Sequence, residues 1–199
     1  MARLRHDRLL AVDTEWTCWE GGPPEGQERE IVEIGVVEAD PRSLEILREA
    51  RFLVRPVLST VSPYCTALTG LTGEELRRNG RPLGEALRSL AKIFGPGAKP
   101  WLAWGDDRSG IAAACRRLVV PNPFPDEGFI DLGLQFGALA GLRERPGLRM
   151  ALDALGLGFE GRPHSAVCDA RNALRVQLEL SARLRRELTP DPVSAPAFR

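Results

Sequence analysis

The sequence predicts an α/β fold in which a five-stranded mixed sheet is flanked by helices. Three observations support this fold class. A buried apolar run near the N-terminus is followed by two runs rich in β-branched residues, which is typical of three successive strands. Helical patterns then alternate with two more short strand patterns, as in helices packed on a sheet. The 199 residues, 43% of them hydrophobic, suffice for one domain with a full core.

The first three strands are predicted from apolar runs bounded by turn residues. The first strand opens with the apolar run at 9–12, and two carboxylates stand at its end. A loop rich in Gly and Pro follows at 21–27. The next two strands are predicted over 30–40 and 44–56, joined by the short turn DPRS.

Later elements are predicted from caps and periodicity. The capping box Thr72-x-x-Glu75 predicts a short helix starting near Gly73, and the spacing of apolar residues over 83–95 predicts another helix. The remaining patterns indicate a strand at 101–105, a helix at 107–119, a strand at 129–132, helices over 132–142 and 148–157, and a last helix over roughly 166–187. We therefore expect a single domain over 1–187 and a disordered tail over 188–199.

Charge and cysteine content narrow the class of protein. The 27 basic and 27 acidic residues cancel, so contact with nucleic acid must come from a local patch. The four cysteines show no CxxC pairs and no clustering with the two histidines, which argues against a structural zinc site and favours reduced thiols. No apolar stretch is long enough to span a membrane. We expect a soluble, cytoplasmic protein with no membrane partner.

The pair Asp13 and Glu15 is the first candidate site. Residues two apart on a strand share a face, so both carboxylates would aim at one point, where a divalent cation would hold both ionised. The alternative is that the strand ends at Val12 and both lie in a solvated turn. For an isolated D-x-E pattern, that alternative is the more common one.

The second candidate is the stretch GRPHSAVCDARNAL. His164 precedes a predicted helix and Asp169 lies in its first turns. An Asp that helps hold a metal, beside a His that accepts a proton from water, suits hydrolysis. Alternatively, His164 is a loop residue and Asp169 a favourable charge near a helix N-terminus.

The third candidate is AWGDDRSGIAAAC. Asp107, Ile111 and Cys115 fall on one helical face, so Asp107 would face the sheet, whereas Asp106 is the more natural N-cap. Ordinary capping would also explain both aspartates.

These stretches together resemble a known family. DTEWTCW (13–19), AWGDDR (103–108) and HSAVCDARNA (164–173) are similar to the three motifs of the DEDDh, or DnaQ-like, 3′–5′ exonuclease superfamily, whose fold is ribonuclease H-like. The stretch SPYCTALTGLT and the spelling of the motifs resemble the branch with the histone-mRNA and enhanced-RNAi exonucleases and the bacterial KapD-like proteins. The resemblance runs from about residue 8 to about residue 180.

The resemblance implies a site and a reaction. Metal ligands would be Asp13, Glu15, Asp107 and Asp169, with His164 as general base and two Mg²⁺ or Mn²⁺ ions as cofactors. The substrate would be the 3′ end of single-stranded RNA or a short oligonucleotide, and the product a nucleoside 5′-monophosphate. Relatives read W-G-x-x-D, and the position of that Asp is Arg108 in this chain. A turn that is one residue shorter restores the match, because Asp107 keeps the spacing to an apolar residue four positions on and a Cys eight positions on. We therefore take Asp107 as the second-motif acid, with Asp106 as the alternative.

Three more residues are candidates for substrate contact. Thr17 resembles family groups that hold the terminal nucleotide, and the ring of Trp16 could stack on a base, more readily than that of Trp19. Arg171 and Arg175 share a helical face and could meet phosphates, although a solvated charged face explains them too. Protein partners cannot be inferred.

Two other functions remain open. A DNA-directed 3′–5′ exonuclease of the proofreading type would use the same residues. A catalytically inactive nuclease fold that serves as a binding module is suggested only by the irregular second motif.

Overall fold

The computed structural model describes residues 4–189. The strands are β1 (Leu9–Trp16), β2 (Ile31–Asp40), β3 (Glu45–Leu53), β4 (Trp101–Ala103) and β5 (Phe129–Asp131). The helices are α1 (Pro63–Thr69), α2 (Gly73–Asn79), α3 (Leu83–Phe94), α4 (Asp107–Arg117), α5 (Leu132–Leu139), α6 (Leu148–Leu155) and α7 (Ala166–Leu188), with a 3₁₀ turn at Pro96–Ala98. The predicted tail lies outside the described residues from 190 on, and its first residue, Leu188, still belongs to α7.

The five strands form one mixed sheet in the order β3-β2-β1-β4-β5. The pairs β1–β2 and β2–β3 are antiparallel, whereas β1–β4 and β4–β5 are parallel. The predicted five-stranded mixed sheet is therefore confirmed. Because β1 and β4 run the same way, their carboxyl ends meet at one edge of the sheet.

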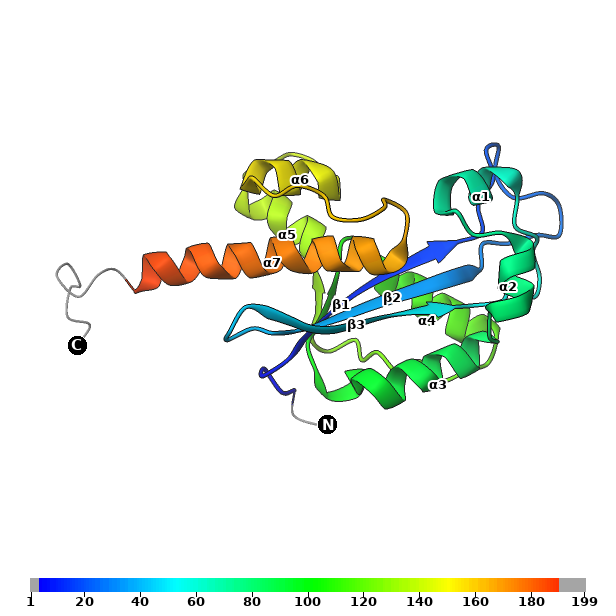
Figure 1. The fold of residues 1–199 in the computed structure, drawn as a ribbon, viewed down its shortest axis with the longest axis horizontal. Coiled ribbons are helices and arrows are strands. Elements are labelled where there is room, and N and C mark those ends of the chain that lie inside the picture. The colour runs from blue at the N-terminus through cyan, green and yellow to red at the C-terminus, as the bar shows by residue number, and fades with distance from the viewer. Residues whose placement is uncertain (1–3, 190–199) are drawn as a thin grey trace.

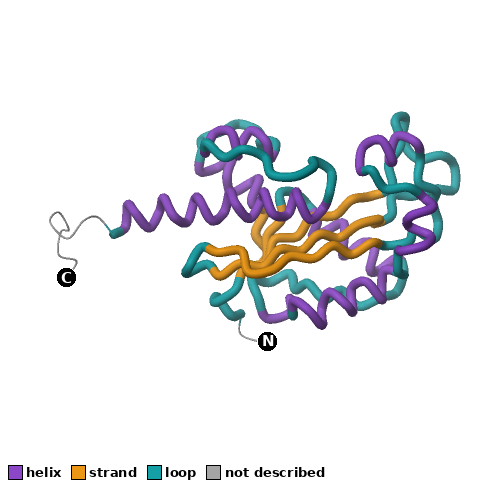
Figure 2. The backbone as a smooth tube through the Cα atoms, viewed as in Figure 1, coloured by secondary structure: helices purple, strands orange, loops and turns teal. Residues whose placement is uncertain are grey.

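Helices cover both faces of this sheet. In Figure 1, α5, α6 and the long α7 lie on one face, α3 and α4 lie on the other, and α1 and α2 stand at the end toward which β1 points. Figure 2 shows the same layers, with the strands between the two helical layers. Side chains alternate along β1 accordingly. Leu10 and Val12 are buried with α3 and α4, while Leu9 and Ala11 are buried with α6 and α7.

Most predicted elements are confirmed, and one helix was missed. Thr72 caps α2 as expected, since its hydroxyl accepts the Glu75 N–H. The stretch before Thr72 was interpreted as irregular because its Ser, Pro and Thr residues disfavour helix interiors, but it contains α1. Ser62 is its N-cap and Pro63 its first residue, and both residue types favour a helix start.

The N-terminus of α7 lies directly on β2 at Gly35. A Cβ atom at Gly35 would stand 2.2 Å from the carbonyl carbon of Ala166, closer than any real packing contact. Only glycine therefore permits this approach, which fixes the height of the first turn of α7 above the sheet.

Two further expectations concern thiols and membranes. Cys18, Cys65, Cys115 and Cys168 all carry free thiols. Within residues 4–189, no helix combines the length and the apolar character needed to cross a membrane.

Candidate active site

The strand β1 supplies the first two acids. It continues past Val12 to Trp16, so Asp13 and Glu15 lie inside the strand and not in a solvated turn. Both share the face of Leu9 and Ala11, toward α7. Glu15 is buried beside β2, where it stands opposite Glu33.

The loop before α7 and the first turn of that helix supply His164 and Asp169. The backbone N–H of His164 donates to Oδ2 of Asp169 at 2.9 Å, and His164 itself adopts a left-handed backbone with φ of 59°. One ligand atom each of Glu15, His164 and Asp169 lies within 4.8 Å of the other two. Residues about 150 positions apart in the sequence thus meet at one point.

The helix α4 supplies the fourth acid, Asp107, which is its first residue. The Thr14 hydroxyl donates to Oδ1 of Asp107, and the Asp107 charge acts strongly on Asp13. Asp106 occupies the N-cap position as predicted, but it is exposed and its side chain makes no capping bond. The structure therefore brings Asp107, and not Asp106, to the pair on β1.

The four carboxylates disfavour one another's ionisation. Burial raises the pKa of Asp13 well above its usual range, and the charges of Asp107 and Asp169 raise it further. Burial, then the charge of Asp169, raises the pKa of Glu15 to about 8. Burial also raises the pKa of Asp169 to about 6, and it raises that of Asp107. Without an added positive charge, these groups cannot all be ionised at neutral pH.

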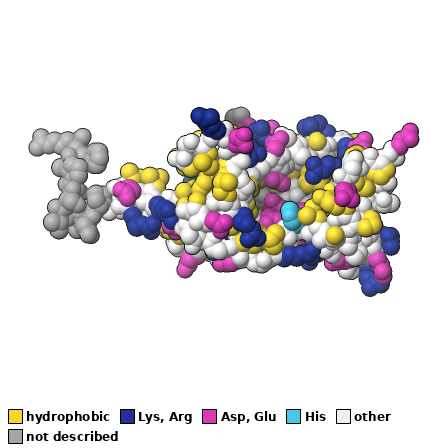
Figure 3. All heavy atoms as spheres, turned by 90° about the horizontal axis from the view of Figure 1, so that it is seen from above, with side chains coloured by type: hydrophobic (Ala, Val, Ile, Leu, Met, Phe, Trp, Pro, Cys, Tyr) yellow, Lys and Arg dark blue, Asp and Glu magenta, His cyan; other side chains and the backbone are white. Residues whose placement is uncertain are grey.

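This donor set fits hard divalent cations. Four carboxylates and one imidazole converge at the sheet edge, and oxygen-rich sets of this kind suit Mg²⁺ and Mn²⁺ better than thiolate-seeking metals. Seen from above, the surface is hollowed near its middle, where acidic side chains lie with a histidine beside them (Figure 3). A divalent cation held by these carboxylates would favour their ionised forms.

The three predicted substrate contacts are placed differently. Trp16 lines a cavity next to the acids. Thr17 does not face that cavity: it is fully buried, and its hydroxyl bonds to the backbone of Glu28 and Glu30. The guanidinium of Arg171 is held by Glu49 of β3.

Several residues near the site were not recognised from the sequence. Thr14 holds Asp107, and the carboxylate of Glu33 accepts the N–H of Ala166 at the start of α7. The fully buried Asn172 bonds both the N–H and the carbonyl of Glu160, which fixes the segment leading to His164. The one available signal was spacing, because Asn172 lies three residues after Asp169 on the same helical face.

A mixed sheet in this order, with four acids and a histidine gathered at the end of its central strand, defines a nuclease of the ribonuclease H-like class. The chain belongs to the exonuclease family RNase_T, whose model matches residues 10–177. The resemblance to the DEDDh exonucleases is thereby confirmed.

Individual relatives agree with this assignment. The human 3′-5′ exoribonuclease 1 is 29% identical over 187 residues, which cover 88% of this chain and 52% of that protein. The exonuclease Snipper of Drosophila melanogaster is 30% identical over 194 residues, covering 86% of this chain and 68% of that protein. The crystallographic structure of the nuclease domain of 3′hExo, a DEDDh family member bound to rAMP, superposes with a TM-score of 0.80 at 27% identity, over 92% of this chain and 95% of that one. The chain spans about half the length of the mammalian exoribonucleases that it matches.

Proposed function

We propose that this chain is a divalent-metal-dependent 3′–5′ exonuclease that releases nucleoside 5′-monophosphates from single-stranded RNA or short oligonucleotides. The observation that carries the proposal is the convergence of Asp13, Glu15, Asp107 and Asp169 with His164 at one sheet edge. The names of the relatives, two of them 3′–5′ exoribonucleases and one bound to rAMP, support both the direction and the RNA substrate.

The four acids would hold two Mg²⁺ or Mn²⁺ ions. Such ions supply a lowered pKa for the attacking water and positive charge for the developing charge on the phosphate oxygens. The charges of Asp107, Asp169 and Glu15 all raise the pKa of Asp13, as expected for carboxylates that share one cation site.

His164 would act as the general base. Its imidazole is exposed on the loop, and its ring nitrogen lies near both Glu15 and Asp169. It accepts a proton as the water oxygen bonds to phosphorus, and the bond from phosphorus to the 3′ oxygen of the preceding nucleotide breaks. That 3′ oxygen takes a proton from solvent, so the shortened strand ends in a 3′ hydroxyl and the product is a 5′-monophosphate. Exposure lets His164 return its proton to water for the next cycle.

Trp16 would contact the substrate with its ring, as base-stacking aromatics do. The roles of Thr17 and Arg171 in substrate binding stay proposals, and both side chains also have partners within the protein. Four free thiols are in keeping with the cytoplasmic location that we propose.

The test uses 5′-labelled single strands of RNA and DNA with one sequence, assayed with Mg²⁺ or Mn²⁺. We expect the labelled strand to become shorter by one nucleotide at a time from its 3′ end, with release of nucleoside 5′-monophosphates. We expect the RNA strand to be degraded faster than the DNA strand. Asp13→Asn and Asp169→Asn should each lose at least about 100-fold in rate, and His164→Ala about 100-fold to 10,000-fold.

Matched controls are available on the surface. Asp153 and His6 are exposed, so Asp153→Asn and His6→Ala should leave the rate unchanged. Circular dichroism would show that each variant is folded. Full activity of folded Asp13→Asn would overturn the proposal. Faster degradation of DNA would overturn only the preference for RNA.

A further inference from the structure

A cavity of about 570 Å³ opens beside the acidic cluster, between β1 and α4. Its size is within the roughly 300–1,000 Å³ typical of ligand pockets. Its lining includes the acids Asp13, Asp106 and Asp107 and the cations Arg29 and Arg117. Trp16 and small residues of α4 line it as well.

This cavity begins at Asp13, on the α7 face of β1, and extends to the α4 side of the strand, away from His164. Trp16 alternates with Asp13 and Glu15 along the strand and packs with the α3 and α4 layer, whereas Glu15, His164 and Asp169 meet on the α7 side. In an in-line displacement, the attacking water and the leaving oxygen stand on opposite sides of phosphorus. A water activated by His164 therefore places the leaving 3′ oxygen, and the nucleotide that carries it, toward the cavity.

The cavity lining also contains the guanidinium of Arg29. The guanidinium of Arg29 stands 5.8 Å from the ring centroid of Trp16, and within residues 4–189 it forms no ion pair. Arg117 by contrast pairs with Glu28 at 2.7 Å and donates to the carbonyl of Arg29 at 3.0 Å. Arg117 thus holds the segment in place, and Arg29 is left to bind a ligand.

The lining next to Arg29 is suited to a base. Gly110 lets α4 approach Trp16, since a Cβ there would stand 2.8 Å from the indole ring. Ala113 and Ala114 continue the same surface of small residues. An apolar surface ending in an unpaired guanidinium matches a nucleotide, with a flat apolar part and a phosphate.

Building on the proposed function, we propose that this cavity binds the nucleotide immediately upstream of the scissile bond and that Arg29 contacts the phosphate on the 5′ side of that nucleotide. The enzyme would then recognise two consecutive phosphates, the scissile one at the acids and the next one at Arg29. A short substrate that lacks the second phosphate should bind less tightly.

The test compares two dinucleotides of one sequence, with and without a 5′ phosphate, because only the first carries the phosphate assigned to Arg29. We expect the wild-type chain to prefer the phosphorylated dinucleotide by about tenfold in kcat/KM, mainly through KM. Arg29→Gln should abolish this preference, and Arg29→Lys should keep part of it. Arg116→Gln is the matched control, since Arg116 is an exposed arginine of α4 that does not line the cavity.

Two measurements separate this proposal from the function on which it rests. The p-nitrophenyl ester of thymidine 5′-monophosphate has no upstream nucleotide, so Arg29→Gln should hydrolyse it at the wild-type rate. Binding of a labelled single strand is measured by fluorescence anisotropy in the Asp169→Asn variant, with and without Arg29→Gln. The slope of log K against log salt concentration should be smaller in magnitude by about 0.7 when Arg29→Gln is present.

Each contrary outcome has a distinct meaning. Equal cleavage of the two dinucleotides by the wild-type chain, or a preference that survives Arg29→Gln, would overturn the assignment of Arg29. An equal loss on the nitrophenyl ester would place Arg29 at the terminal nucleotide and would overturn it as well. Failure of the wild-type chain on every substrate would count against the proposed function itself.

Discussion

The hydroxyl of Thr14 donates a hydrogen bond to Oδ1 of Asp107, which joins the middle of β1 to the first residue of α4. The indole N–H of Trp16 donates to the same Thr14 oxygen at 2.9 Å. A short chain of bonds therefore leads from the cavity lining to one of the proposed metal ligands. Thr14 lies between the two acids of the first motif, where its side chain faces the opposite layer.

Removing the Thr14 hydroxyl should weaken metal binding and lower activity without abolishing either. Thr14→Val keeps the shape of the side chain but cannot hold Asp107, so we expect activity to fall by about 10- to 100-fold, as for other residues that orient a metal ligand. Thr14→Ser should restore most of it. The check is kcat and the Mn²⁺ concentration for half-maximal rate, and an unchanged metal requirement in folded Thr14→Val would contradict the role.

The two adjacent aspartates should differ sharply in their effect. Asp107→Asn removes a carboxylate that the structure brings to Asp13, and we expect a loss on the order of 100-fold in rate. Asp106→Asn changes an exposed side chain and should stay within about threefold of wild type. Single-turnover rates at saturating Mn²⁺ decide between them. A reversal of this order would make Asp106 the second-motif acid.

Binding of Mn²⁺ should tighten as the pH rises from 6 to 8. The pKa values of Glu15 and Asp169 are raised to about 8 and about 6, so protons must leave these carboxylates before a cation can bind. A tenfold tighter site adds about 1.4 kcal/mol to the free energy of unfolding. For a chain of this size, that is about 3–5 °C in Tm.

Differential scanning fluorimetry with and without Mn²⁺ at several pH values would measure this gain. The gain should be absent in Glu15→Gln at every pH, because that variant lacks one of the ligands. A gain that is the same at pH 6 and pH 8 would show that the two carboxylates lose no protons on binding.

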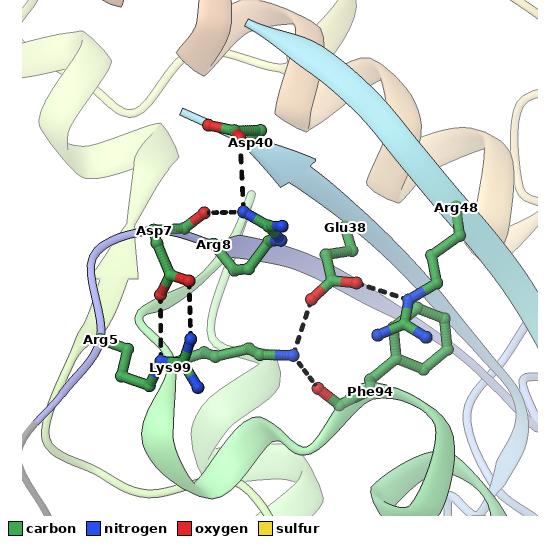
Figure 4. A network of polar contacts seen from close by, with 8 residues as sticks. All are labelled: Arg5, Asp7, Arg8, Glu38, Asp40, Arg48, Phe94 and Lys99. Carbon is green, nitrogen blue, oxygen red and sulfur yellow. Dashed lines mark hydrogen bonds and ion pairs between the residues drawn. The ribbon is translucent and has the colours of Figure 1, made fainter. Parts of the chain in front are cut away.

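Stability at the other end of the sheet rests on Glu38. This buried carboxylate of β2 pairs with Lys99 at 2.7 Å and with Arg48 at 2.5 Å, and Lys99 also donates to the carbonyl of Phe94 (Figure 4). Burial would raise the pKa of Glu38, but its bonds to Lys99 and Arg48 outweigh it, so the pKa is lowered. Glu38→Gln should therefore cost about 1–3 kcal/mol in the free energy of unfolding at pH 7.

The sign of the pH dependence follows from this lowered pKa. The ionised carboxylate stabilises the fold fully above its unfolded value near 4.5, and the contribution is lost as the pH falls through the folded pKa. The difference in stability between wild type and Glu38→Gln, measured by urea unfolding, should thus shrink at low pH. Nuclease activity should be unaffected, because Glu38 lies opposite Leu10, well away from Glu15 along the same strand pair.

Periodicity and caps predicted nearly all of the fold because they are local signals. The helix α1 was missed because Ser62 and Pro63 are breakers inside a helix yet favourable at its start. The end of β1 could not be predicted from its own residues. β1 continues to Trp16 because pairing with β2 satisfies its backbone, and the sequence of β1 alone does not contain that information.

The acids and the histidine could be predicted because a resemblance joined motifs that are distant in the sequence. The hydrogen-bond and ion-pair partners of individual side chains could not be predicted. Thr17 was expected to contact the substrate, and its hydroxyl forms hydrogen bonds to the backbone of Glu28 and Glu30. Arg171 was expected to contact the substrate as well, and it forms an ion pair with Glu49. The partner of a polar group depends on which segments meet in space, so the sequence did not indicate which groups Asn172 and Thr14 would bond to.

The contact of α7 with Gly35 has a consequence for how the site can adapt. With the first turn of α7 seated on β2, Asp169 keeps a constant position relative to Asp13 and Glu15, which belong to the neighbouring strand. Asp107 comes from the opposite layer and is joined to β1 through Thr14. The acid on α7 is therefore positioned by close backbone packing, whereas Asp107 is positioned by a side-chain hydrogen bond. We expect changes of substrate among related sequences to arise in α4 and the segment around Arg29, while the surface under α7 stays as it is.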